Sequence, residues 1–89
     1  MPDYKQYILE NEQLYRDLWD SNEAFRQYSD AVYRYLDRMP RGHEVRFEGY
    51  PMPQLQWIIW TSCIHMYSHG NQAEYCFKDD YTAYIHEKE

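Results

Sequence analysis

The sequence predicts a small single α+β domain, with two amino-terminal helices followed by a strand, a helix and a β-hairpin. Apolar residues recur at helical spacing through residues 4–39 and alternate with polar residues in short stretches at 43–50 and 73–85. A longer apolar run lies between Pro53 and Gly70. With 89 residues the chain has the length of one domain. We therefore expect a three-stranded antiparallel sheet packed on helices.

The amino-terminal part is expected to hold two helices. On the first, one side collects Tyr4, Tyr7, Ile8, Leu14, Tyr15, Leu18 and Trp19, and only Leu9 points away. The second helix, about Asn22–Met39, is expected to begin at a cap formed by Asp20 or Ser21 and to end at Pro40. One continuous helix is the alternative, because the apolar positions stay nearly in phase across the junction. Such a helix needs a partner along its length, which means a dimer.

The second half of the chain changes its period. Val45 and Phe47 alternate with charged residues, which is typical of a half-buried strand within residues 43–50. The helix expected at about Pro53–His69 is apolar over more than half of its circumference, so it should lie at the centre of the domain. The alternative for this wide arc is an exposed aromatic groove for a partner peptide. Gln56 lies inside the arc and needs a hydrogen-bonding partner if it is buried.

The last segment alternates twice and predicts a hairpin with its turn at residues 78–80. Its inward-facing residues are expected to be Ala73, Tyr75, Phe77, Tyr81, Ala83 and Ile85.

The charge of the chain limits its partners. Residues 1–42 hold six Lys and Arg against eight Asp and Glu, and residues 43–89 hold three against seven, which gives −6 in total. Binding to phosphates by counterion release needs the opposite sign, so neither nucleic acid nor a membrane surface is an expected partner. No basic segment followed by an apolar run begins the chain, and the longest apolar run has four residues. With only two cysteines, we expect a cytoplasmic protein with reduced thiols.

Histidine and cysteine on the central helix raise the possibility of a metal site. His65 and His69 are spaced to lie on one helix face, as zinc ligands often do. Cys63 lies about 160° from His65 at ~100° per residue, so we expect it in the core. Both histidines belong to a stripe that we expect to be solvated, with Gln54, Thr61, Ser62 and Ser68. No metal-binding motif supports the pair, so neither a metal nor a cofactor is expected.

No motif points to catalysis, and an enzyme is not expected. The order strand, helix, hairpin resembles that of winged-helix domains, in which a hairpin wing follows a recognition helix. The resemblance is limited to this order, because the usual second helix is missing and the third helix presents His65 and His69 with no cation. A nucleic-acid-associated regulator with a degenerate winged-helix-like shape is the alternative function.

Tyrosine is the most unusual part of the composition, with 11 residues of 89. Most tyrosines fall on predicted apolar faces and are expected in the core: Tyr4, Tyr7, Tyr15, Tyr28, Tyr35, Tyr67, Tyr75 and Tyr81. Tyr33, Tyr50 and Tyr84 do not. Tyrosine is abundant where proteins bind each other, because its ring is apolar and its hydroxyl stays wet.

The predicted partner-binding surface joins these three tyrosines to a basic stripe at the end of the second helix, formed by Arg34, Arg38 and Arg41. The alternative for the stripe is a structural one, in which the cations complement the helix dipole and pair with acids four residues away. The predicted function is a small non-enzymatic protein-interaction or regulatory module. Its partner is an unknown protein or a second copy of the chain.

Overall fold

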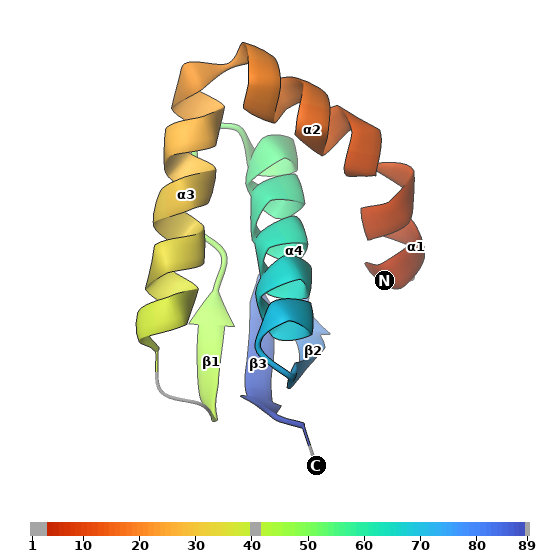
Figure 1. Ribbon diagram of the computed structural model, residues 1–89, viewed down its shortest axis with the longest axis vertical. Coiled ribbons are helices and arrows are strands. Elements are labelled where there is room, and N and C mark those ends of the chain that lie inside the picture. Colours follow the sequence, from red (N-terminus) through yellow and green to blue (C-terminus); the bar gives the residue numbers. More distant parts are fainter. Residues whose placement is uncertain (1–3, 40–41, 89) are drawn as a thin grey trace.

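The computed structural model describes residues 4–39 and 42–88, with side chains from Gln6 onward. The described elements follow in the order α1 (Tyr4–Glu10), α2 (Glu12–Ser21), α3 (Glu23–Arg38), β1 (His43–Arg46), α4 (Pro53–Gly70), β2 (Ala73–Asp79) and β3 (Thr82–Glu87). The three strands form one antiparallel sheet in the order β1-β3-β2. Helices pack on one face of this sheet, where α3 and α4 lie side by side and α4 contacts β2 (Figure 1). The predicted α+β class and the order of its elements are confirmed.

The predicted first helix is divided in two. A turn at Asn11 separates α1 from α2, and the Asn11 side-chain amide donates a hydrogen bond to the Tyr7 carbonyl (2.9 Å). Such a bond competes with the regular ladder of a helix. The predicted break before α3 is present, so the single long helix is wrong. The cap is Asn22, whose side-chain oxygen accepts a hydrogen bond from Phe25 N (3.0 Å), and not Asp20 or Ser21.

The sheet turns its apolar side chains toward the helices, as the alternation predicts. Val45 and Phe77 both lie opposite Ala83 on the central strand, and Val45 and Ala83 are fully buried. The prediction that Tyr81 faces inward is wrong, because Tyr81 lies in the hairpin turn and is 53% exposed. A register shift follows Phe77, and the Asp79 carboxylate accepts a hydrogen bond from Tyr81 N (2.8 Å). The turn is therefore at residues 80–81, and residues 78–79 of the predicted turn belong to β2.

The segment after β1 is held by the start of α4. β1 is shorter than the predicted strand, and residues 47–50 cross to the amino-terminal end of α4. The Gln56 side chain bridges this crossing: its amide donates to Phe47 O (3.1 Å) and its oxygen accepts from Tyr50 N (3.0 Å). The predicted need of Gln56 for a partner is therefore confirmed.

α4 is the centre of the molecule, as its wide apolar arc predicts. It packs against α1, α2, α3 and β2, and Cys63 is 1% exposed, as expected for a core residue. The predicted solvated stripe is wrong at Thr61, Ser62 and Ser68, which are buried, and is confirmed at Gln54 and His69, which are exposed. Small hydroxyl residues fit where helices approach closely, and Thr61 satisfies its hydroxyl within the helix by donating to Trp57 O (2.7 Å).

The tyrosines are distributed differently from the prediction. Tyr15 and Tyr67 are buried, as predicted. Tyr35 is 50% exposed, so its predicted place in the core is wrong, as it is for Tyr81. α3 packs mainly on α2 and α4, so the covered part of its surface is narrower than its apolar face. Tyr7, Tyr28 and Tyr75 are half-buried against the core, and the Tyr4 side chain lies outside the described residues.

Candidate functional site: an apolar groove beside α4

A groove of about 680 Å³ lies between α4 and the arm formed by α1 and α2 (residues 4–21). Figure 1 shows this arm crossing the upper ends of α3 and α4 and then descending beside α4. The walls of the groove are mostly apolar and are formed by Ile8, Leu9, Tyr15, Trp19 and Met66. Its volume is within the range of pockets that bind ligands in proteins, about 300–1,000 Å³.

Two side chains of the groove are apolar and open to solvent. Leu9 is 67% exposed and Met66 is 43% exposed, although Ile8 beside Leu9 is buried. Successive residues of a helix point about 100° apart, so the face that docks α1 through Ile8 turns Leu9 into the groove. Leu9 is the residue that departs from the apolar face of its predicted helix. That departure was the sequence signal for this site.

Aromatic contacts hold the arm in place. The ring of Tyr7 meets Trp57 edge to face with centroids 4.0 Å apart, and Tyr15 meets Phe25 at 5.4 Å. Each such pair adds about 0.5–1.5 kcal/mol beyond the burial of its area. These contacts join α1 to α4 and α2 to α3, so the two walls of the groove are fixed relative to each other.

The floor of the groove is joined to the core by polar atoms. The Tyr15 hydroxyl lies 3.7 Å from Cys63 Sγ, which in turn donates to Ser29 O (3.5 Å). Burial raises the pKa of Tyr15 above its ordinary value and that of Cys63 to about 12. The Cys63 thiol is therefore protonated at neutral pH, and a buried thiol is a poor nucleophile. Nothing in this cluster favours covalent chemistry.

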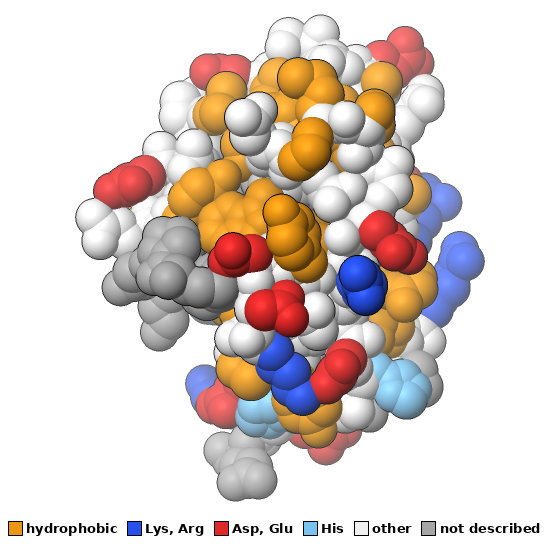
Figure 2. Space-filling model, turned by 180° about the vertical axis from the view of Figure 1, so that it is seen from behind, with side chains coloured by type: hydrophobic (Ala, Val, Ile, Leu, Met, Phe, Trp, Pro, Cys, Tyr) orange, Lys and Arg blue, Asp and Glu red, His pale blue; other side chains and the backbone are white. Residues whose placement is uncertain are grey.

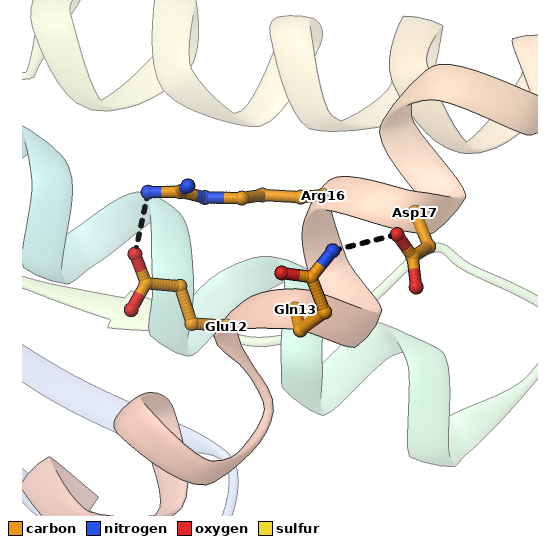
Figure 3. Close-up of polar contacts among 4 residues, drawn as sticks. All are labelled: Glu12, Gln13, Arg16 and Asp17. Carbon is orange, nitrogen blue, oxygen red and sulfur yellow. Dashed lines mark hydrogen bonds and ion pairs between the residues drawn. The ribbon is translucent and has the colours of Figure 1, made fainter.

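Charged side chains form the rim. Figure 3 shows polar contacts along α2, where Arg16 pairs with Glu12 (2.6 Å) and Gln13 donates to Asp17 (2.8 Å). Glu12, Arg16 and Asp20 line the groove. Asp20 forms no ion pair with another described residue. The arm is acidic, since residues 4–21 hold four carboxylates against two cations, a net charge of −2.

The two histidines of α4 are parallel to each other. Their rings are 6.5 Å apart, and His65 Nδ1 lies 2.9 Å from the Tyr75 hydroxyl. His65 also lines the groove. Within residues 4–39 and 42–88, no three His, Cys, Asp or Glu side chains are grouped as metal ligands. The histidine pair thus lacks further ligands among the described residues.

Two predicted partner-binding tyrosines pack against the core. Tyr33 is half-buried and meets Tyr67 edge to face at 5.7 Å. Tyr50 is also half-buried, and its ring lies 5.1 Å from that of Tyr28. Packing of this kind explains both tyrosines without a partner.

The remaining predicted residues lie on different faces of the molecule. Arg34 is exposed on α3 and pairs with Asp30 (2.9 Å), as the structural alternative predicts, and Arg38 is exposed in the last turn of α3. Tyr84 lies on the outer face of the sheet, with Lys78 over its ring at 5.5 Å. Arg41 lies outside the described residues. The structure does not bring Tyr50 and Tyr84 together with the arginines at one described site.

The outer side of the sheet is polar. Figure 2 shows the molecule from behind. Acidic and basic side chains are intermingled over the lower half of this view, where the strands lie, and hydrophobic side chains gather in the upper half. Glu44 pairs with Lys78 across the ring of Tyr84, which is stacked with His86 at 5.6 Å. Hence this surface offers mixed charge and not a patch of one sign.

Comparisons with known proteins returned nothing similar: no protein-family model matches the chain, and no curated protein or solved structure matches it. The groove is therefore interpreted from its own chemistry. Among the described helices, none is long and apolar enough to cross a membrane.

Proposed function

We propose that this protein is a small non-enzymatic interaction module that binds a partner protein in the groove between α4 and the α1–α2 arm. The observation that supports this most strongly is the pair of solvent-exposed apolar side chains, Leu9 and Met66, that face one groove from two helices. Apolar surface of this kind on a monomer is often a binding site when polar residues surround it. Burying Leu9 and Met66 beneath a partner removes them from water.

The groove supports this function better than the predicted tyrosine and arginine surface does. Tyr33 and Tyr50 are explained by packing, whereas Leu9 has no such explanation. The charged side chains of Glu12, Arg16 and Asp20 line the same groove as Leu9 and Met66, and charges of this kind can select a partner. The surface formed by Tyr33, Arg34, Arg38, Arg41, Tyr50 and Tyr84 stays a prediction.

The nucleic-acid alternative has less support. The order β1, α4, β2, β3 is the strand, helix, hairpin order on which this alternative is based. However, α4 is at the position of the recognition helix, and it is covered by helices on one side and by the sheet on the other. Its exposed residues include Met66 and His69 but no Lys or Arg. A helix that reads base edges needs exposed donors in a groove of DNA.

Site-specific crosslinking tests the proposed function. A photoreactive amino acid at position 66 should crosslink to a discrete protein in an extract of cells that express the chain. The same group at position 14 is the control, because Leu14 is as exposed as Met66 (43%) but does not line the groove. Equal labelling from both positions, or no labelling from position 66, would overturn the groove as the interaction site.

A further inference from the structure

We infer that the partner enters the groove as an amphipathic α-helix whose apolar stripe is flanked by Lys or Arg. This inference rests on the proposed function and names the chemistry of its partner. It is based on three features of the groove: walls made only of helices, apolar anchors on both walls, and an acidic rim.

The walls favour a helix over an extended peptide. All lining residues belong to α1, α2 and α4, whose backbone groups are already hydrogen-bonded within their own helices. An extended peptide needs an exposed strand edge to satisfy its backbone, and no strand lines this groove. A helix satisfies its own backbone hydrogen bonds and can pack its side chains between those of two neighbouring helices.

The apolar side chains on both walls favour a partner with an apolar stripe. Leu9 comes from the arm and Met66 from α4, and the buried Tyr15 of the arm also lines the groove. Met is flexible and adapts to different apolar side chains, which suits a binding wall. Anchors at positions i, i+3, i+4 and i+7 of a partner helix form one continuous stripe that such a groove can bury.

The charge of the rim selects the flanks of that helix. The arm has a net charge of −2 over residues 4–21, and Asp20 on the rim forms no ion pair with another described residue. The whole chain carries −6. Cationic flanks therefore meet attraction from the rim and from the molecule as a whole, whereas acidic flanks meet repulsion.

Synthetic helical peptides of about 16 residues provide the probe. All share Leu at i, i+3, i+4 and i+7 and contain no aromatic residue, and their flanks are Lys, Gln or Glu. Calorimetry gives the affinity, and the tryptophan fluorescence of the protein, to which the groove-lining Trp19 contributes, gives a second signal of binding. We expect the Lys peptide to bind most tightly and the Glu peptide not at all, with the Lys peptide losing about threefold or more in affinity from 50 to 500 mM salt.

Variants of the protein locate the binding. Met66→Glu and Leu9→Glu change exposed residues, so both variants should fold. Each variant should lower the affinity for the Lys peptide about tenfold or more. Leu14→Glu is the matched control and should bind as the parent protein does. Asp20→Lys should lower the affinity for the Lys peptide about threefold or more. Asp37→Lys makes the same charge change on α3 and should lower this affinity less. Circular dichroism checks that each variant is folded.

The possible failures are distinguishable from failure of the proposed function. Equal affinity for the Lys and Gln peptides would overturn the charge inference, and equal binding of a proline-containing Lys peptide would overturn the helical form. Crosslinking from position 66 without any peptide binding would overturn this inference and leave the interaction function standing. A native dimer that Met66→Glu dissociates would make a second copy of the chain the occupant and would also overturn it.

Discussion

At the scale of single residues, Gly49 is a position where the backbone leaves no room for a side chain. Its φ of +101° lies in the left-handed region, and a Cβ placed there would come 2.7 Å from the Tyr28 hydroxyl. That hydroxyl donates a hydrogen bond to Glu48 O, which also accepts from Trp60 Nε1 (3.2 Å). Gly49 thus lets the segment after β1 turn against α3 and α4.

Replacing Gly49 with alanine should therefore destabilise the protein. We expect Gly49→Ala to lower the free energy of unfolding by about 1–3 kcal/mol, because the side chain meets both an unfavourable φ and the Tyr28 hydroxyl. Urea denaturation measures the change. Gly70→Ala is the control: Gly70 ends α4 and its nearest side-chain neighbour is 4.0 Å away, so this variant should be as stable as the parent protein or more stable. Equal loss in both would contradict the backbone argument.

The two cysteines differ in their surroundings. Cys63 is buried beside Tyr15, whereas Cys76 is exposed on β2. Burial raises the pKa of Cys63 from 9.0 to about 12, so the folded protein holds the thiol proton over a pH range in which the unfolded chain loses it. Because the pKa of the thiol is higher in the folded state than in the unfolded state, its contribution to stability is complete at pH values below the unfolded pKa. Stability then falls as the pH rises above that value.

Stability should accordingly decrease in alkali. Between pH 9 and 10 we expect the free energy of unfolding to fall by about 1 kcal/mol, because the unfolded thiol ionises and the folded one does not. Above pH 10 the decrease should be steeper, because burial also raises the pKa of Tyr15 above its ordinary value. Denaturant titrations at several pH values measure the slope. The Cys63→Ala variant should be less stable at neutral pH, but its free energy of unfolding should change less between pH 9 and 10. An unchanged slope in that variant would show that Cys63 is not responsible.

At the scale of elements, the junction between α2 and α3 determines the direction of the arm. The Asn22 side chain caps α3 at Phe25 N, while the Ser21 hydroxyl donates back to Asp17 O (2.6 Å) within α2. Asn22 has extended backbone angles, φ −127° and ψ 105°, so the chain changes direction there. That change folds α2 back across α4 and creates one wall of the groove.

Removing the cap should destabilise α3 and with it the placement of the arm. We expect Asn22→Ala to cost about 1 kcal/mol, since it leaves one amino-terminal N–H of α3 without its partner. Ser21→Ala should change the free energy of unfolding by less than about 0.5 kcal/mol, because the Ser21 hydroxyl is exposed and caps no helix. Thermal denaturation followed by circular dichroism compares the two variants. A larger loss for Ser21→Ala would reverse the assignment of the cap.

At the scale of the whole molecule, the charge is unfavourable for phosphate binding. The chain carries −6, and the outer side of the sheet mixes cations with carboxylates, as in the pair of Lys78 and Glu44. We expect no binding to random duplex DNA even at about 50 mM salt, where such binding is strongest. A fluorescence anisotropy titration tests this. Salt-sensitive binding at low ionic strength would instead favour the nucleic-acid alternative.

Much of the fold could be predicted because local patterns agree with the tertiary structure. Val45, Gln56 and Cys63 lie where the periodicity and the need for hydrogen bonds place them. The turn after β2 could not be located to the residue, because the Asp79 side chain and a register shift move it. Burial of Ser62 and Ser68 was also missed, since small hydroxyl residues are equally compatible with a wet face and with close packing.

The candidate site was largely beyond prediction from the sequence. Leu9 was visible as an exception to its helix face, but Met66 fell within an apolar arc that was expected to be covered. The groove combines residues 8–20 with residues 62–66, and no local pattern reports which segments far apart in the chain become neighbours. The cap at Asn22 and the turn at Asn11 decide that arrangement.

The sequence by itself therefore determined the α+β class, the order of the elements and the central position of α4. Hydrophobic periodicity is sufficient for this, because it fixes the angle of each side chain around its own helix or strand. Only the tertiary structure decided which faces are covered, that Tyr33 and Tyr50 pack inward, and that Leu9 and Met66 stay open. Coverage depends on the neighbouring elements, and the direction in which the chain leaves Asn22 selects those neighbours for α4.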